Sequence, residues 1–205
     1  LSATIEYSNN NPTTTNWESF WKDKNAQTVY FQGKDNVPFH AMILPAILLG
    51  YGELNLPYDI PANQYVMMGG DKASSSRNTA IWVPDYLKHL SADQLRYYLT
   101  CIMPETSDSE FNWEDFVSRN NDELAAKWGN LVQRVVSFTK NRMDNTIPNQ
   151  TSSTSESKKL KKFIQDTYVS AGNKIEKVEL RAALSLIMNA AQETNKYLEK
   201  TEPWK

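Results

Sequence analysis

The 205-residue chain carries a group of polar residues, 33–40, directly after a β-prone run that should end at the ligand-binding edge of an open α/β sheet. Gly33 allows close approach to the backbone, and the carboxylate of Asp35 can accept hydrogen bonds from ribose hydroxyls. Asn36 and His40 are four residues apart and share a helix face. The same spacing also fits a helix cap followed by a buried, hydrogen-bonded histidine.

A second polar segment, residues 69–78, follows another β-prone run and opens with two glycines. The glycines predict a mobile loop, in which Lys72, Ser74, Ser76 and Arg77 combine two cations with hydroxyl groups. Such a loop can close on a triphosphate and neutralise the charge that develops as pyrophosphate leaves. A polar surface turn explains the composition equally simply.

A third group of residues lies in the second half of the chain. Asn130 and Arg134 are one helical turn apart, and Trp204 follows a proline at the end of a predicted helix. An amide and a guanidinium so placed can read the edges of unpaired RNA bases, and an indole can stack on a splayed base. The alternatives are a solvated helix face and a tryptophan that packs on its own domain.

The first half of the chain reads as strand, helix, strand and loop. Its opening residues look strand-like, residues 8–15 read as a loop, and a short helix is predicted over 17–24 behind an Asn16 cap. Strands are predicted at 29–32 and 64–68, on either side of an apolar helix over 37–51 that should be buried and bent at Pro45. This order is typical of a parallel α/β sheet.

The second half reads as helical. The apolar spacing predicts helices over 84–90, 92–103 (capped by Ser91) and 113–139, the last as one long helix or a bent pair. After a polar connector at 144–157, two more helices are predicted over 158–170 and 174–198. We therefore predict an α/β region over 1–110, which is an incomplete Rossmann-like unit, followed by an all-α bundle over 111–205 that is also truncated.

Composition narrows the class of protein. Hydrophobic residues make up 40% and charged residues 22%, as in ordinary globular domains, and no apolar run reaches the roughly 18 residues of a membrane span. The single cysteine, Cys101, and two histidines predict neither a disulfide nor a metal site and favour a reducing, cytoplasmic compartment. The net charge of −2 argues against a DNA-binding protein, but it divides into −5 over 1–110 and +3 over 111–205, so the second half could face RNA phosphates.

The order of four motifs resembles one family. Residues 72–77, Lys-Ala-Ser-Ser-Ser-Arg after Gly-Gly, resemble the Lys-Met-Ser-Lys-Ser loop of class I aminoacyl-tRNA synthetases. Residues 33–50, 92–99 and 111–116 are similar to the segments that surround this loop in the methionyl-tRNA synthetases. The resemblance implies methionine activation with ATP and Mg²⁺, followed by transfer to tRNA(Met).

The resemblance also implies roles for individual residues. Gly33 and Asp35 would contact the ATP ribose, and Asn36 and His40 would lie beside the methionine side chain. Lys72 would stabilise the phosphates in a catalytic loop that also contains Ser74, Ser76 and Arg77. Because Ser75 stands where many members carry a second lysine, Lys72 would take more of that role.

In the helical half, the resemblance assigns Asn130, Arg134 and Trp204 to the methionine anticodon. The family's His-x-Gly-His turn and its zinc-binding insertion have no counterpart in this sequence, and Leu1 is not a natural start. We therefore expect a piece of a longer enzyme that is inactive alone, with zinc held only in the preceding part. Two alternatives stay open: a sibling class I synthetase for another apolar amino acid, and a non-catalytic tRNA-binding or scaffolding module.

Overall fold

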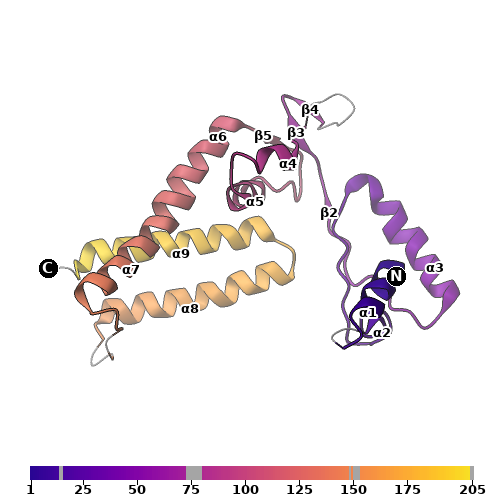
Figure 1. Cartoon of the computed structure of the whole chain (residues 1–205), viewed down its shortest axis with the longest axis horizontal. Coiled ribbons are helices and arrows are strands. Elements are labelled where there is room, and N and C mark those ends of the chain that lie inside the picture. The colour runs from indigo at the N-terminus through magenta and orange to yellow at the C-terminus, as the bar shows by residue number, and fades with distance from the viewer. Residues whose placement is uncertain (14–15, 73–79, 148, 150–152, 204–205) are drawn as a thin grey trace. The chain divides into compact units, whose positions relative to one another are not determined.

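The computed structural model describes residues 1–13, 16–72, 80–147, 149 and 153–203, with the side chains of 71 and 72 left out. The chain forms two compact units, which are largely helical and contain small sheets with parallel strand pairs (Figure 1). Unit 1 comprises residues 1–65 and 104–107, and unit 2 comprises 66–103 and 108–205. The division by role that the sequence predicts at residue 110 stays a prediction.

Unit 1 opens with a helix, α1 (Ser2–Asn10), followed by α2 (Trp17–Trp21). The strand-like opening and the loop from residue 8 predicted for this region are therefore wrong. The helix ends before Asn11, because a residue that precedes proline avoids the helical conformation. The predicted cap on α2 is confirmed, since the Asn16 side chain accepts a hydrogen bond from the Glu18 amide.

The centre of unit 1 is a strand–helix–strand unit of the predicted order, but its second strand lies at residues 62–63, before the strand predicted over 64–68. Strand β1 (Gln32–Gly33) pairs in parallel with β2 (Ala62–Asn63), and Gly33 lies opposite Asn63. The connection contains η1 (Lys34–Asn36), η2 (Phe39–Ile43) and α3 (Leu44–Tyr51). In η2 the Leu44 amide bonds to the Phe39 carbonyl, so the helix is widened one residue before Pro45, which has no amide hydrogen to donate.

The apolar helix over 37–51 is not buried as predicted. Leu48 is the buried side chain of α3, whereas the large apolar side chains around it are more than half exposed in the described chain: Phe39, Met42, Ile47, Leu49 and Tyr51. The composition of this segment correctly predicts a helix that is apolar on every side. Burial on every side would also require neighbouring elements on every side, and within unit 1 the helix packs on its Leu48 side only.

Unit 2 begins with a three-stranded sheet. Strand β3 (Val66–Met68) pairs antiparallel with β4 (Asp71–Lys72) and parallel with β5 (Ser109–Phe111), in the order β4-β3-β5. The single strand predicted over 64–68 is thus shorter, and its residues are half-buried. Strand β5 was not predicted, because three residues before a helix cap carry no detectable alternation.

The helices of unit 2 follow the predicted order. They are α4 (Val83–Tyr86), α5 (Ala92–Cys101), α6 (Trp113–Ser118), η3 (Arg119–Gly129), α7 (Asn130–Arg142), α8 (Ser155–Glu176) and α9 (Leu180–Thr201). The predicted Ser91 cap is confirmed as a reciprocal capping box with Gln94. An aromatic core joins α4, α5, β5 and α6, in which Tyr98 contacts Phe111 and Phe116 edge to face.

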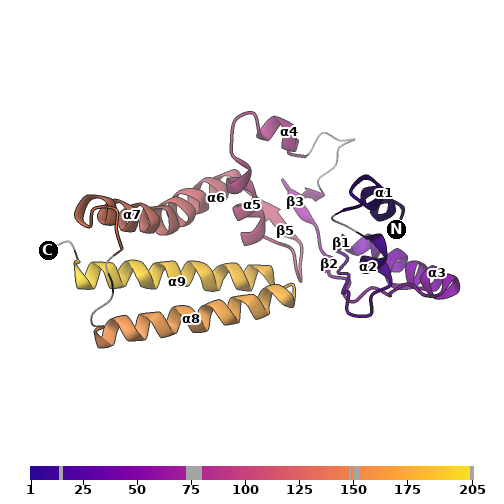
Figure 2. The same cartoon turned by 60° about the horizontal axis from the view of Figure 1, so that its bottom comes forward.

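The long helix predicted over 113–139 is confirmed as a continuous rod, because η3 lies between α6 and α7 with helical dihedrals at both junctions. Helices α8 and α9 lie side by side and antiparallel, and the rod lies against α9 (Figures 1 and 2). The predicted break after residue 170 is wrong, because α8 continues through Gly172 to Glu176. Buried Ala171, Ala183 and Ala191 explain this, since small side chains let the two helices approach closely.

Candidate functional site

In unit 1, side chains of the 33–40 segment contact the two residues that follow β2. The Lys34 ammonium donates to the Gln64 side-chain oxygen at 2.9 Å and lies 4.2 Å from the centre of the Tyr65 ring. The hydroxyl of Tyr65 donates a hydrogen bond to the Asp35 carboxylate. The parallel pairing of β1 with β2 brings these residues together although they are 30 positions apart.

The Asp35 side chain is exposed, and its carboxylate accepts the hydrogen bond of the Tyr65 hydroxyl. The backbone beside it is also accessible, because no atom lies within 4 Å of the position that a Cβ would take at Gly33. Sequence reasoning missed the roles of Gln64 and Tyr65, which it placed inside the strand predicted over 64–68 and which follow β2 instead.

Asn36 and His40 lie one turn apart, as predicted, and are linked through the backbone. The Nδ1 of His40 is 3.2 Å from the Asn36 carbonyl oxygen, and the half-buried imidazole lies 5.7 Å from the Tyr30 ring, centre to centre. This contact fixes the ring orientation and leaves the Nε2 atom as the second ring nitrogen for another partner. The Asn36 side chain is exposed.

In unit 2, the two glycines before the predicted catalytic loop form a tight hairpin turn, and the mobility predicted for the loop stays a prediction. Gly69 and Gly70 have φ values of 63° and 80°, as a type I′ turn between β3 and β4 requires. The Gly70 amide donates to the Glu110 carboxylate at 3.1 Å. The turn places the backbone of Lys72 in β4, opposite Met67.

The structure does not test the remaining loop residues. Ser74, Ser76 and Arg77, predicted to act in catalysis, lie outside the described residues, as does Trp204, predicted to stack on the anticodon. The side chain of Lys72 also lies outside the described part of the chain. The roles of these residues stay predictions.

The structure places Asn130 and Arg134 at the start of α7, on the part of the rod that lies along α9. Asn130 is exposed, whereas the Arg134 side chain is 30% exposed and its Nη1 lies 3.7 Å from the Glu199 carboxylate on α9. The guanidinium is therefore held across two helices rather than left on a solvated face. Sequence reasoning missed Glu199, because 65 positions separate it from Arg134.

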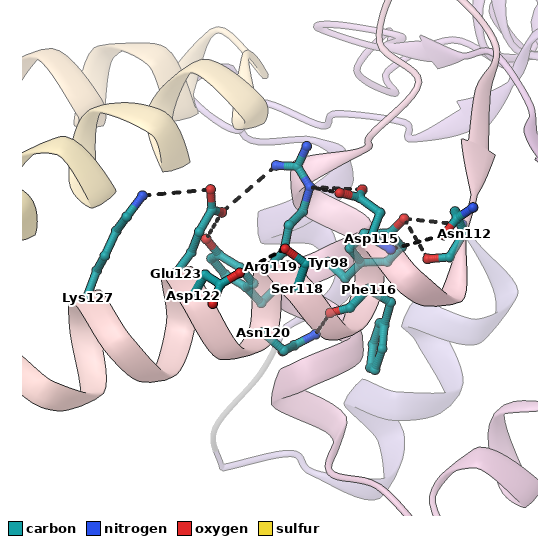
Figure 3. A network of polar contacts seen from close by, with 11 residues as sticks. Tyr98, Asn112, Asp115, Phe116, Ser118, Arg119, Asn120, Asp122, Glu123 and Lys127 are labelled. Carbon is teal, nitrogen blue, oxygen red and sulfur yellow. Dashed lines mark hydrogen bonds and ion pairs between the residues drawn. The ribbon is translucent and has the colours of Figure 1, made fainter.

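A network of polar contacts fixes the start of the rod to α5 (Figure 3). The fully buried Tyr98 donates its hydroxyl to the Asn112 carbonyl at 3.1 Å and accepts the Asn112 amide at 3.2 Å. The Asn112 side chain caps α6 by accepting the Asp115 amide. This arrangement satisfies the backbone groups at the helix entry and fixes the direction of the rod.

The network continues along η3 as alternating charges (Figure 3). The Nε of Arg119 bonds to Asp115 at 2.9 Å, and Glu123 lies between Arg119 and Lys127 at 3.9 and 3.8 Å. The buried Tyr97 of α5 donates its hydroxyl to Glu123 at 2.7 Å. Burial and this carboxylate both raise the pKa of Tyr97, so the hydroxyl stays a donor at any physiological pH.

Two further properties concern ions and membranes. Over the described ranges, the structure holds no group of three or more His, Cys, Asp or Glu residues that could bind a metal ion. No helix in the same ranges has the length and apolar character needed to span a bilayer.

The comparisons with known proteins decide the family. A model of the family "tRNA synthetases class I (M)" matches residues 1–136, and a methionine–tRNA ligase of Thermomicrobium roseum is 47% identical over 205 residues. The chain belongs to the methionyl-tRNA synthetases. A methionine–tRNA ligase of Pyrococcus furiosus is also 40% identical over 216 residues. Both matches cover all of this chain but 35% and 30% of the relatives, so the chain spans about a third of their length.

Solved structures agree with the sequence comparisons. A Mycobacterium tuberculosis methionyl-tRNA synthetase bound by methionyl-adenylate is similar, with a TM-score of 0.77 and 27% identity over 88% of this chain and 35% of that chain. A second structure of the M. tuberculosis enzyme, in complex with methionyl-adenylate, gives a TM-score of 0.78 at 25% identity over 98% and 40%. The family membership expected from the four motifs is therefore confirmed.

Proposed function

We propose that this chain is part of a methionine–tRNA ligase, which activates methionine with ATP to methionyl-adenylate and transfers the methionyl group to tRNA(Met). The observation that carries the proposal is the match to methionine–tRNA ligases over the whole chain, which includes both the 33–40 segment and the Asn130–Arg134 face. The similar structures that are named as adenylate complexes support ATP as the substrate, with Mg²⁺ as its expected counterion.

We assign residues 1–110 to the second half of a Rossmann-like catalytic domain and 111–205 to an anticodon-binding helix bundle. In the first region, Gly33 and Asp35 contact the ATP ribose, Gly33 through its open backbone and Asp35 through its exposed carboxylate, a group that accepts hydrogen bonds from hydroxyls. His40, oriented by the Asn36 carbonyl, lies with Asn36 beside the methionine side chain. The parallel strand pair that precedes this segment supports the assignment, because open α/β sheets bind ligands at this edge.

Lys72 neutralises phosphate charge during adenylate formation, assisted by Ser74, Ser76 and Arg77. The test is Lys72→Ala in an active protein that contains this chain, measured by methionine-dependent ATP–pyrophosphate exchange. We expect a fall of about 100-fold or more in kcat, in line with the loss of one preorganised charge contact in a transition state. The matched control is Lys88→Ala, which removes an exposed lysine paired with Asp85 and should leave kcat unchanged.

The Asn130–Arg134 face reads the CAU anticodon, and Trp204 stacks on one of its bases. We would measure binding of this chain to a CAU stem-loop and to a stem-loop with one anticodon base changed, at fixed salt. The proposal predicts at least about tenfold weaker binding after the base change, and a further loss with Asn130→Ala. Asn121→Ala, an exposed asparagine on the same rod, serves as the control. Equal binding to both stem-loops would contradict anticodon reading by this face.

A further inference from the structure

The parallel register of β1 and β2 continues in the side chains that follow the two strands. The last backbone pair of this sheet joins Gly33 to Asn63. Asp35 and Tyr65 each lie two positions beyond that pair, and the Tyr65 hydroxyl donates a hydrogen bond to the Asp35 carboxylate. The strand pairing therefore sets this contact, which distinguishes it from a chance meeting of two surface side chains.

A second contact holds the Tyr65 ring. Lys34 and Gln64 each lie one position beyond the same backbone pair, and their side chains are hydrogen-bonded at 2.9 Å. The Lys34 ammonium also lies 4.2 Å from the centre of the Tyr65 ring, in the position of a cation–π contact. This cation restrains a ring that is already half-buried, so Tyr65 is a rigid donor for the carboxylate that it contacts.

Asp35 gains order from this donor. It is the middle residue of η1, a helix of three residues, and its side chain is exposed. An exposed side chain on so short an element loses rotamer freedom when it binds a ligand, and that loss weakens binding by roughly two- to tenfold. A hydrogen bond that orders the carboxylate before the ligand arrives removes part of this cost.

We propose that Tyr65 is a positioning residue for the nucleotide: it holds the Asp35 carboxylate in the orientation that accepts a ribose hydroxyl, and Lys34 holds the Tyr65 ring. The inference rests on the proposed function, because it takes the ATP ribose as the group that Asp35 contacts. Tyr65 acts through Asp35 and raises the affinity for ATP without taking part in the chemical step.

The test is Tyr65→Phe in an active protein that contains this chain, measured by methionine-dependent ATP–pyrophosphate exchange. Phenylalanine keeps the ring beside Lys34 and removes the hydroxyl that donates to Asp35. Tyr58→Phe is the matched control, because it removes the same atom from an exposed tyrosine that precedes β2. KM is determined for methionine, ATP, 2′-deoxy-ATP and 3′-deoxy-ATP.

We expect Tyr65→Phe to raise the KM for ATP about two- to tenfold, with kcat and the KM for methionine changed by less than about twofold. The preference for ATP over at least one deoxy analogue should fall by about the same factor, because that analogue lacks the hydroxyl whose acceptor is no longer oriented. Tyr58→Phe should leave all these quantities unchanged. Equal increases in the KM of ATP and of methionine, with an unchanged preference, would overturn the proposal, because they would show a general disturbance.

A double variant with Asp35→Ala separates positioning from direct contact. Once the carboxylate is absent, Tyr65→Phe should raise the KM for ATP by less than about twofold further, because the hydroxyl has no carboxylate to orient. An undiminished effect of Tyr65→Phe in Asp35→Ala would mean that Tyr65 contacts the nucleotide itself, and it would overturn the positioning role.

The role of Lys34 has its own pair of variants. Lys34→Met keeps an unbranched side chain without the charge, so it should lower the preference for ATP over the same deoxy analogue. Lys34→Arg should preserve that preference, because a guanidinium also stacks on an aromatic face. A Lys34→Met protein with the full preference would overturn the part of the proposal that concerns Lys34.

Failure of the proposed function gives a different result. If Asp35→Ala leaves both the KM for ATP and the preference over the two deoxy analogues unchanged, the proposed ribose contact is wrong and the inference fails with it. If Asp35→Ala changes them and Tyr65→Phe does not, the ribose contact stands and only the positioning role is wrong.

Discussion

Replacing Tyr98 with phenylalanine should measure how strongly the start of the rod is fixed to α5. The side chain has 0% exposure, and its hydroxyl makes two hydrogen bonds to the backbone of Asn112. Phenylalanine preserves the edge-to-face contacts with Phe111 and Phe116 and removes only these bonds. At about 1 kcal/mol for each bond, the free energy of unfolding should fall by about 2 kcal/mol.

Tyr86→Phe is the matched control. The Tyr86 ring belongs to the same aromatic core, but its hydroxyl makes a single bond, to the Ser91 carbonyl at 3.1 Å. The loss there should be about 1 kcal/mol. The ratio of the two losses depends on the number of bonds and is insensitive to the exact strength of each.

Urea unfolding followed by far-UV circular dichroism would measure both losses. With a slope of about 2 kcal/mol/M, the midpoint should fall by about 1 M for Tyr98→Phe and about 0.5 M for Tyr86→Phe, with unchanged slopes. A Tyr98→Phe midpoint no lower than that of Tyr86→Phe would refute the reasoning. It would mean that water satisfies the Asn112 backbone as well as the tyrosine does.

Three other predictions concern the proposed anticodon face (Asn130–Arg134), Cys101 and two glycines, Gly70 and Gly172. Glu199→Gln should strengthen stem-loop binding up to about tenfold, because it removes a negative charge that lies beside Arg134; weaker binding in fluorescence anisotropy would contradict this. Burial raises the pKa of Cys101, so its rate of alkylation should rise with pH at a midpoint above that of an ordinary thiol, and a lower midpoint would count against it. Gly70→Ala, at a φ of 80°, should cost about 1 kcal/mol, whereas Gly172→Ala within α8 should stabilise by a similar amount; losses of equal sign in urea unfolding would refute the comparison.

The features that could be predicted from the sequence are those set by neighbouring residues. The Asn16 and Ser91 caps depend on side chains within three positions of the amides they accept, so the pattern alone located them. Local patterns also predicted the order of strand, helix and strand around Gly33, although the second strand was predicted over 64–68 and lies at 62–63. The exposure of α3 and the pairing of β5 depend on what lies beside them, and no local pattern carries that information.

In the candidate site too, the features set by neighbouring residues could be predicted and those set by distant residues could not. Chemistry-bearing residues such as Asp35 and Arg134 could be named from type, spacing and family resemblance. The partners that orient them, Tyr65 and Glu199, come from 30 and 65 positions away. They became apparent only when the fold had placed β2 beside β1 and α9 beside the rod.

The widened segment η3 makes the orientation of the proposed anticodon face, Asn130–Arg134, sensitive to the number of residues that precede it. An α-helix turns by about 100° per residue, so removing one residue between Arg119 and Gly129 would rotate everything beyond it by that angle. Arg134 would then point away from Glu199, although every side chain proposed to contact the anticodon would still be present. A relative that is one residue shorter here therefore needs either a normally wound helix that recovers the lost phase or another residue to read the RNA.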